Sequence, residues 1–542
     1  MRRYKNLVSN LRKRSKSNLF LRTLTVSLVF ALCLIQASRK SCEIVNEKYT
    51  SGKASKTSSI NVPTFKGFSL CSPSLEYDYQ ERLQRGKEAR KHIETVGETS
   101  PNLFWYAVEP TWSCSTEIRV GGLGDGGKYL CGYDFSRQKA FDQDCVIYSF
   151  GSAGRDDFEN FLSSNTGCKI HIFDPTPRIR KQMTIRARKY GAQFHSIGLG
   201  GFDRNFNKVG IWQSDLKESS LKIFTLPEIM ENLNHTRVDI LKVDIEGSEY
   251  DAFEVILENC TLDIEIILIE LHVLGSNSRD QIFKLISSLE RCRYRMFHKE
   301  PNYQGCHGTK CVELAFTNFD CKYESPHEII KMNHERDLAE RRSSLIGYLK
   351  NGKKRHHNPR LFWDFYEPDS VCKSLRRIGG FTPGGLYTCA MSKKCHVLLF
   401  GDFHEIHEDF SQQCIGVERK SISEIFSLTS RSTPSRYSLA AVRFEDKNNP
   451  EIEVYRNLAG IVSRSCENLP DQISVEIHWI FGTNSSKEVS GHEDILIELF
   501  TSLERCNFSI FHKEPNLLSG RGHRYLMYGW IKHEKLLSDW AT

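Results

Sequence analysis

A glycine turn and an acidic residue further along the chain have the residue types and spacing of a nucleoside-binding site. The turn contains Gly151, Ser152 and Gly154 and follows an apolar run. Glycine suits a backbone that takes positive φ or approaches a ligand closely, because a Cβ atom would clash there. Asp174 follows a second apolar run, about 20 residues after the turn, and an acid at that spacing can accept hydrogen bonds from ribose hydroxyls. Together these features predict a nucleoside site.

Two carboxylates and a histidine stand where acid–base chemistry is expected. Asp244 and Glu246 follow a fourth apolar run, and His272 ends a fifth. Such groups can take a proton from a reacting hydroxyl. His272 has two interpretations, a general base or a histidine kept for packing, and the sequence leaves both open. Glu249 is predicted to be a first-turn acid that the helix dipole favours.

Strands that alternate with helices must bring these residues together. Apolar runs predict strands at 146–150, 168–173, 193–197, 238–243 and 264–272, with helices between most of them. This alternation is typical of a parallel sheet with helices on both faces, in which ligands bind at the carboxyl ends of the strands. Asp174, Asp244 and His272 all fall at such ends. The predicted fold class is α/β, a doubly wound, mostly parallel, Rossmann-like sheet.

Part of the sequence occurs twice. Ser-Leu-Glu-Arg-Cys at 288–292 and Phe-His-Lys-Glu-Pro-Asn at 297–302 return at 502–506 and 511–516. Self-similarity on this scale predicts two copies of one domain in the chain. Because the copies are fused, we also expect them to pair with each other within the chain.

The second copy is shorter, and its losses help to separate cofactor residues from folding residues. Asp244 is replaced by Arg443, and the strand that carries Asp174 is predicted to have no counterpart. His272 is retained as His478. The second copy is therefore not expected to bind the nucleoside, and a retained residue can be kept for folding alone.

The N-terminus has the features of a secretory-pathway protein. A basic segment precedes an apolar run at 24–35, which predicts either a cleaved signal peptide or a signal-anchor with its basic end in the cytosol. Ile35 stands where a cleavage site prefers a small residue, which favours the anchor. The body would then face the lumen of the Golgi or endoplasmic reticulum as a single-pass type II membrane protein, or be secreted if the leader is cleaved. The 18 cysteines and four N-glycosylation sequons agree with an oxidising lumen, disulfide bonds and a glycoprotein.

Charge and cysteine spacing argue against a nucleic-acid surface and a zinc site. The formal net charge of +7 comes largely from the basic N-terminal segment, so nothing else in the chain indicates a nucleic-acid surface. Cys306 and Cys311 could form half of a zinc site, but no second paired cysteine motif completes it. No metal site is predicted.

Composition divides the chain into five parts. We expect a cytosolic basic tail with the signal-anchor or signal peptide at 1–38, a stalk and charged helix at 39–101, an intact domain at 102–323, a polar connector at 324–359 and the truncated, degenerate copy at 360–542. The charged helix is expected to be solvated.

Several motifs, in this order, carry a family resemblance. They are Arg119-Val-Gly-Gly-Leu-Gly-Asp-Gly-Gly-Lys128, Tyr148-Ser-Phe-Gly-Ser152, Phe173-Asp-Pro-Thr176 and Leu241-Lys-Val-Asp-Ile-Glu-Gly-Ser-Glu249. Together they resemble the methyltransferase-like protein 24 family, which is related to FkbM-type methyltransferases. The resemblance covers about 102–320 well and 360–535 in degraded form. It implies a class I S-adenosylmethionine fold, a seven-stranded sheet with helices on both faces.

The resemblance also implies roles for residues at matching positions. The turn glycines would lie under the methionine moiety of the cofactor, Asp174 would hold the ribose, and Ile197 and Gly198 would border the adenine. The cofactor-binding set is then Gly151, Ser152, Gly154, Asp174, Ile197 and Gly198, and the candidate catalytic set is Asp244, Glu246 and His272.

These features predict an S-adenosylmethionine-dependent methyltransferase that uses its first domain on a small-molecule, glycan or lipid acceptor. The acceptor group is expected to be a hydroxyl or a carboxyl. Methyl transfer from a sulfonium is an in-line displacement, so the protein mainly aligns the reactants and excludes water. Two other classes stay open. A lumenal glycosyltransferase would use Asp244 and Glu246 as an acidic metal motif, and a non-catalytic binding module would keep the fold for contacts alone.

Overall fold

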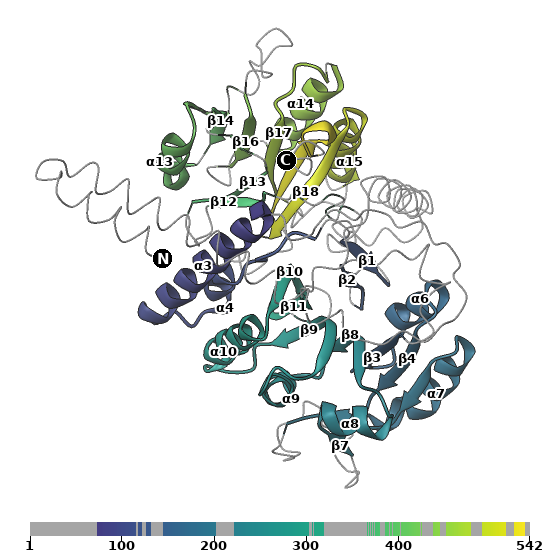
Figure 1. Cartoon of the computed structure of the whole chain (residues 1–542). Coiled ribbons are helices and arrows are strands. Elements are labelled where there is room, and N and C mark those ends of the chain that lie inside the picture. Colours follow the sequence, from purple (N-terminus) through teal and green to yellow (C-terminus); the bar gives the residue numbers. More distant parts are fainter. Residues whose placement is uncertain are drawn as a thin grey trace, which may run out of the picture. The chain divides into compact units, whose positions relative to one another are not determined.

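The computed structural model divides the chain into two units, 1–66 and 67–542, and describes residues of the second only (Figure 1). The described residues are 73–114, 117–121, 126–131, 145–201, 222–302, 306, 308–318, 366, 368, 370, 372, 374–379, 385–389, 391–392, 394–401, 403–422, 424, 437–444, 451–464, 466–478, 490–515 and 525–536. The predicted leader, most of the stalk and the connector lie outside these ranges. No helix within them is long and apolar enough to cross a membrane.

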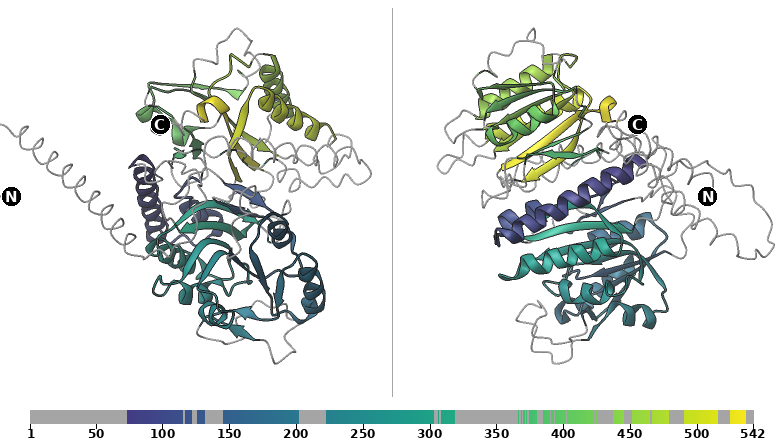
Figure 2. Two further views of the ribbon diagram at one scale, coloured as in Figure 1. Left: turned by 45° about the vertical axis from the view of Figure 1, so that its right-hand side comes forward. Right: turned by 60° about the vertical axis from the view of Figure 1, so that its left-hand side comes forward.

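The described fold begins with a packed helix where a solvated one was predicted. Helix α3 (Pro73–Thr95) buries Ile93, and its Arg90 pairs with Glu290 of α10 (Ser278–Arg291) at 2.8 Å. Figure 2 shows α3 beside α10. The prediction of a solvated helix was wrong, because apolar residues recur among the charges and some of the charges have buried partners.

A seven-stranded sheet forms the core of the first half, and we call it the first sheet. Its order is β10-β11-β9-β8-β3-β4-β5. The strands are β3 (Val146–Phe150), β4 (Lys169–Phe173), β5 (Gln193–His195), β8 (Arg237–Val243), β9 (Asp263–His272), β10 (Tyr294–Asn302) and β11 (Gly308–Asn318). The strands from β9 to β5 run parallel, whereas β11 runs antiparallel to both β9 and β10. The predicted α/β fold with a mostly parallel sheet is confirmed.

Helices cover both faces of the first sheet, because successive side chains of a strand point to opposite faces. Ile147 packs into a core with α6 (Asp157–Asn165) and α7 (Arg180–Lys189). Its neighbour Tyr148 packs into the other core, with α9 (Glu249–Ile256) and α10. The central strands are buried on both faces, which explains their nearly continuous apolar sequences.

Shorter elements flank the first sheet. They are α4 (Pro101–Phe104), η1 (Trp105–Ala107), β1 (Ile118–Val120), β2 (Lys128–Leu130), η2 (Pro177–Ile179), β6 (Gly198–Leu199), β7 (Ile223–Phe224) and α8 (Leu226–Asn232). Strands β1 and β2 pair antiparallel, and β6 pairs parallel with β7. The predicted third strand therefore ends at His195, and Gly198 belongs to a separate pair of strands.

A six-stranded sheet, the second sheet, forms the core of the second half. Its order is β15-β14-β16-β17-β19-β18. The elements are β12 (Arg376–Ile378), β13 (Leu386–Thr388), β14 (His396–Gly401), α13 (His404–Gln413), β15 (Gly416–Lys420), β16 (Leu439–Arg443), α14 (Glu451–Arg464), β17 (Gln472–His478), α15 (Ser490–Arg505), β18 (Phe508–Pro515) and β19 (Tyr525–Lys532). The strands β14 to β17 are parallel, and β19 is antiparallel to its neighbours.

The second sheet corrects one prediction from the sequence. Strand β15 runs parallel beside β14, as β4 does beside β3, so the strand that carries Asp174 does have a positional counterpart. Ser421 follows β15 at the position of Asp174. Within the described residues the second sheet has no strand outside β15 at the position of β5. The alignment failed because it matched Gly416 to the turn at Gly198, whereas Gly416 begins β15.

Cysteines are joined in pairs in both halves. The pairs are Cys114–Cys131, Cys145–Cys168, Cys260–Cys292, Cys306–Cys311, Cys372–Cys389, Cys395–Cys414 and Cys466–Cys506. Three pairs of the first half recur at corresponding elements of the second half. Cys306–Cys311 has no such counterpart, since no cysteine follows Cys506 in the sequence.

Candidate active site

The ends of three adjacent strands bring the predicted cofactor residues together. Strand β3 lies between β4 and β8. The Gly151 amide donates to the Phe173 carbonyl oxygen at 3.0 Å, and the Asp244 amide donates to the Phe150 carbonyl oxygen at 3.1 Å. The glycine turn, Asp174 and Asp244 therefore share the carboxyl edge of the sheet, at the point where chain connections diverge to the two sides.

The glycine at the start of the turn is required by packing. Gly151 has φ +78°, and a Cβ built on it would lie 1.6 Å from the Asp244 carbonyl oxygen. The second sheet repeats this contact, since a Cβ on Gly401 would lie 1.8 Å from the Arg443 carbonyl oxygen. Gly151 therefore keeps the turn in close contact with β8 whether or not a ligand is bound.

Asp174 fixes the shape of the glycine turn. Its carboxylate accepts a hydrogen bond from the Ala153 amide at 3.0 Å and one from the Thr176 amide at 2.9 Å. The Ser152 hydroxyl lies 3.5 Å from the same carboxylate. The side chain is buried. Asp174 is thus next to the turn, as its spacing predicted.

Gly198 also lies next to the loop that follows Asp174. A Cβ on Gly198 would lie 3.1 Å from the Pro175 side chain and 2.6 Å from that of Ile223. Ile197 is partly buried and packs against the core on the Tyr148 face. The structure therefore brings the predicted adenine-bordering residues to the side of the turn where Asp174 lies.

A buried cation below the turn was missed in the sequence. Lys242 of β8 is buried, and its Nζ donates to the Gly151 carbonyl oxygen at 3.3 Å. The carboxylate of Glu159 lies 3.8 Å from that Nζ and accepts from the Ser149 hydroxyl. The sequence could have pointed to Lys242, because it is a lysine inside an apolar strand. A buried ammonium group needs a partner.

His272 lies among three carboxylates. Its Nδ1 is 2.9 Å from a Glu249 oxygen, and its Nε2 is 3.4 Å from Glu246 and 4.0 Å from Asp244. Burial alone would lower the pKa of His272, but the hydrogen bond to Glu249 and the three negative charges raise it to about 9. The imidazole is therefore protonated at neutral pH, and its cation holds the three acids together.

Glu249 was predicted only to be a first-turn acid of its helix, but its side chain also makes two specific contacts. Its side chain is fully buried, and it accepts a hydrogen bond from the Ile245 amide at 3.0 Å besides its contact with His272. The sequence could have pointed to this role, because the acid is not retained in the second half: the alignment puts Asn448 at the position of Glu249.

Glu246 is the most accessible acid around His272. Its side chain is 55% exposed, whereas that of Asp244 is 23% exposed. Its backbone has φ +55°, a left-handed conformation that costs free energy in a non-glycine residue and occurs often at functional sites. Partial burial raises the pKa of Glu246, the nearby carboxylates raise it further, and His272 opposes them.

A second ionic cluster lies beside His272. Lys128 of β2 is buried, hydrogen-bonds Glu313 and lies 3.8 Å from Glu270. Asn302 donates to Glu270 at 3.0 Å. Burial raises the pKa of Glu270, and the neighbouring Glu313 and Asp244 raise it further. The β1–β2 hairpin is thereby tied to the strand that carries His272.

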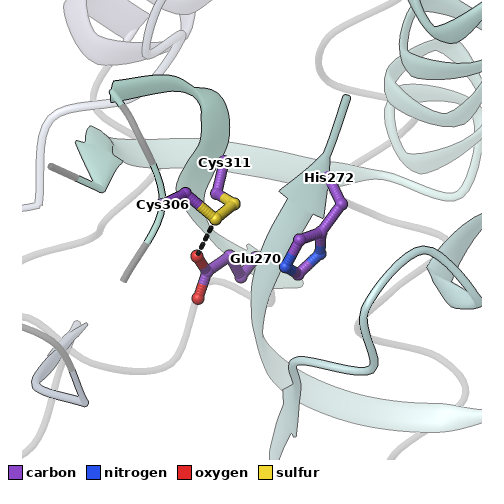
Figure 3. A group of neighbouring side chains, drawn as sticks. All are labelled: Glu270, His272, Cys306 and Cys311. Carbon is purple, nitrogen blue, oxygen red and sulfur yellow. Dashed lines mark hydrogen bonds between the residues drawn. A yellow bond between two sulfur atoms is a disulfide. The ribbon is translucent and has the colours of Figure 1, made fainter. Parts of the chain in front are cut away.

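Two groups of side chains place potential metal ligands within 4.8 Å of one another: Glu270, His272, Cys306 and Cys311, and Asp244, Glu249 and His272. Figure 3 shows the first group, in which Cys306 and Cys311 form a disulfide and Cys306 Sγ lies 3.9 Å from Glu270. Neither sulfur is then a thiolate, the form that binds metals. In the second group His272 Nδ1 lies 2.9 Å from a Glu249 oxygen.

The corresponding edge of the second sheet is arranged differently. Arg443 replaces Asp244, and its Nε lies 3.9 Å from Glu476. His478 Nε2 lies 3.6 Å from the same carboxylate. The guanidinium of Arg443 also donates to the Gly385 carbonyl oxygen at 3.4 Å. In the second half Arg443 therefore pairs with Glu476, whereas in the first half Asp244 stands at the position of Arg443 and lies beside His272.

Comparison with known proteins agrees with the predicted family. Residues 78–318 match a family model described as a methyltransferase domain. Probable methyltransferase-like protein 24 from Rattus norvegicus is 27% identical over 164 residues, which are 28% of this chain and 42% of that protein. The protein of the same name from Homo sapiens is 26% identical over 167 residues, 29% of this chain and 43% of its own length. The chain thus spans less than half the length of these curated relatives.

Solved methyltransferase structures are similar at low scores. FkbM from Methylobacillus flagellatus aligns with 31% of this chain and 43% of its own at 15% identity and a TM-score of 0.23. Aeropyrum pernix fibrillarin, solved with bound S-adenosyl-L-methionine, aligns with 37% of this chain and 82% of its own at 11% identity and a TM-score of 0.22. These scores are too low to support a functional inference. The family model and the curated relatives support the resemblance seen in the motifs: residues 78–318 match a methyltransferase domain, and part of the chain is similar to methyltransferase-like protein 24.

Proposed function

We propose that the chain is an S-adenosylmethionine-dependent methyltransferase with one active site, at the carboxyl edge of the first sheet. The observation that carries the proposal is the buried carboxylate of Asp174 at the end of β4, which accepts a hydrogen bond from the Ala153 amide of the glycine turn. The matched methyltransferase domain supports the same cofactor.

The cofactor would lie along this edge of the sheet. Asp174 and Gly198 would contact its adenosine, and the turn from Gly151 to Gly154 would contact its methionine moiety. The methyl group would then face Asp244 and Glu246. The sulfonium carries a positive charge, so nearby carboxylates favour its binding.

The acidic surroundings indicate a hydroxyl acceptor more than a carboxyl. A carboxylate substrate would be repelled by Asp244 and Glu246, whereas a neutral hydroxyl would not. Glu246 would take the hydroxyl proton as the oxygen attacks the methyl carbon and the sulfur leaves with the bond's electron pair. His272 is already protonated and would position Glu246 instead of acting as the base.

Binding of the cofactor can be tested by calorimetry on the full chain. Asp174→Ala should weaken S-adenosylmethionine binding by tenfold or more, because it removes the group that holds the turn and faces the ribose. Asp280→Ala, at an exposed position on α10, is the matched control and should bind as the wild type does. Absence of binding by the wild type would overturn the proposal and favour a non-catalytic module.

Methyl transfer can be tested with radiolabelled cofactor and a panel of glycan, lipid and small hydroxyl or carboxyl compounds. Glu246→Gln should retain cofactor binding but lower transfer by about 10² or more, the usual contribution of a general base. Glu254→Gln, at an exposed glutamate of α9, should not. Transfer of a sugar in the presence of manganese, with no methyl transfer, would support the glycosyltransferase alternative.

We further propose that the second half is a degenerate copy without cofactor binding, and that the body of the protein lies in the secretory pathway. The corresponding order of strands and the recurring cysteine pairs support a copy of the fold. Ser421 and Arg443, at the positions of Asp174 and Asp244, support the loss of cofactor binding. The cysteine pairs and the sequons support the second. Sensitivity of the expressed protein to an N-glycosidase would test the location, and a cytosolic, unglycosylated protein would contradict it.

A further inference from the structure

We propose that the second half docks within the chain onto the edge strand β10 of the first sheet, and that this docking supports the β1–β2 hairpin beside the active site. The recurring Phe-His-Lys-Glu-Pro segment would be the docking element of each half. Docking itself does not depend on the proposed methyl transfer, although its effect on the hairpin rests on the proposed site.

The same internal contacts recur in each half at this segment. In the first half Arg119 donates to Glu300 at 2.9 Å, and the Tyr129 ring stacks on His298 at 3.6 Å. In the second half the matching contacts are Arg377 to Glu514 at 2.7 Å and Tyr387 to His512 at 3.8 Å. Each half thus presents a similar ionic and aromatic surface around its own edge strand.

Contacts between the halves pair cations of the second with acids and an aromatic ring of the first. Lys513 Nζ lies 3.9 Å from a Glu300 oxygen. The Arg377 guanidinium lies 5.3 Å from the centre of the Tyr106 ring, within the range of a cation–π interaction. At the rim, Arg376 lies 3.7 Å from Glu81 of α3.

The central groups are largely withdrawn from water. The side chain of Arg377 is 6% exposed and that of Lys513 is 10% exposed. Removing one member of a desolvated ion pair leaves the other charge uncompensated, which costs far more than loss of a surface pair. Burial would raise the pKa of Glu300, but Arg119 and then Lys513 outweigh it and lower the pKa to about 2.

The docking surface lies at an edge of each sheet. Strand β10 ends the first sheet and β18 ends the second. Backbone groups of both edge strands bond within their own half: the Thr111 and Trp112 amides donate to the Met296 carbonyl oxygen, and the Ser370 amide donates to that of Ile510. The contacts between the halves are therefore made by side chains. Docking at this edge would give the second half a role that needs no cofactor. It also explains why the segment recurs although Asp244 has become Arg443.

The same contacts lead to the active site. Glu300 holds Arg119, which lies on β1 and pairs with Tyr129 of β2. The preceding residue of β2, Lys128, reaches Glu270. Lys513 of the second half therefore acts on the hairpin through Glu300 and Arg119, as a positioning residue and not a catalytic one.

Docking can be tested on the full chain after cutting the connector. A specific protease site is placed between 324 and 359, the chain is cleaved, and the halves are followed by size-exclusion chromatography and sedimentation at low micromolar concentration. We expect the wild-type halves to co-migrate. Separation of the wild-type halves at low salt would overturn the proposal.

Two sets of variants locate the surface. Lys513→Met should weaken association of the halves by tenfold or more and weaken cofactor binding by the uncut chain, whereas Lys535→Met, at an exposed ion pair with Asp471, should do neither. At the rim, Arg376→Glu should weaken association and Glu81→Arg in the same chain should restore it. This second set keeps the test valid if Lys513→Met fails to fold. Association that is unchanged in both Lys513→Met and Arg376→Glu would overturn the proposed surface.

Discussion

His272 shows how its surroundings set the chemistry of one side chain. A histidine at a strand end could be a base, but here Glu249, Glu246 and Asp244 keep it protonated. A protonated imidazole can donate hydrogen bonds or stabilise negative charge, yet it cannot accept a proton. His272, which is retained as His478, is thus suited to organising the acids beside it. Glu246 is retained as well, as Glu445, whereas Asp244 is replaced by Arg443.

Replacing His272 should make this electrostatic contribution measurable. The pKa is raised from 6.5 to about 9, so the stabilisation is fully present below pH 6.5 and is lost as the pH rises through 9. We expect His272→Gln to be less stable than the wild type by about 3 kcal/mol at pH 6, and by much less at pH 9. Urea unfolding at both pH values measures the difference. His478→Gln serves as the control in the second half, and a gap that widens with pH would contradict the assignment.

Gly151 is a position where one added carbon should be decisive. A Cβ there would overlap the Asp244 carbonyl oxygen at 1.6 Å, and φ is +78°. Gly151→Ala should cost on the order of 3 kcal/mol or more, because backbone must move. Gly191→Ala is the matched control, with φ +83° and no atom within 4 Å of the added carbon; it should cost about 1 kcal/mol from backbone strain. Equal thermal shifts in the two variants would show that the close contact is unimportant.

At the scale of elements, β3, β4 and β5 carry a cluster of aromatic and histidine side chains beside the proposed adenosine position. His171 Nδ1 lies 3.0 Å from His195 Nε2, and the Tyr148 hydroxyl lies 2.7 Å from His235 Nδ1. Burial, followed by the neighbouring charges of His195, His235 and Lys169, lowers the pKa of His171 to about 4. The cluster is therefore neutral at pH 7 and must take up protons in acid.

This cluster predicts acid sensitivity. A folded pKa of about 4 below the ordinary 6.5 means that stabilisation present above pH 6.5 is lost as the pH falls toward 4. Between pH 7 and pH 4 the free energy of unfolding of the wild type should fall by about 2 to 3 kcal/mol more than that of His171→Gln. Denaturant unfolding at pH 7, 5 and 4 measures it, with His92→Gln, at an exposed histidine of α3, as control. Parallel pH profiles of the wild type and His171→Gln would exclude this source of acid sensitivity.

The sequence predicted the elements whose signal is local. Gly151 and Asp174 were found because the turn and the acid have a fixed spacing along the chain. The role of Glu249 could not be found this way, since it depends on the distance between α9 and the end of β9. The position of β15 was missed for a related reason: pairing with β14 is a long-range property, and a short Ile-Gly match misled the alignment. Helix α3 was misjudged because its charges have partners far away in sequence.

At the scale of the whole molecule, the candidate site at the edge of the first sheet has an altered counterpart at the edge of the second sheet. Both sheets place a glycine with positive φ against the carbonyl of the next strand end, at Gly151 and at Gly401. They differ in what surrounds that glycine. In the second half Ser421 follows β15, and Arg443 pairs with Glu476. The shared glycine contact is therefore a requirement of the fold, and Asp174 and Asp244 distinguish the first half.

The chain should accordingly bind one molecule of S-adenosylmethionine. Calorimetry on the full chain should give a stoichiometry near one, and Arg443→Asp should not raise it, because Ser421 would still stand where the first half has Asp174. The double variant Arg443→Asp with Ser421→Asp tests whether restoring both acids is enough for the second half to bind the cofactor. Among the described residues the second sheet has no strand at the position of β5, so the side where adenine would rest stays incomplete, and we expect the stoichiometry to remain near one. A value near two for the wild type would show that the second half binds the cofactor without those acids, and the proposed division of roles between the halves would have to be abandoned.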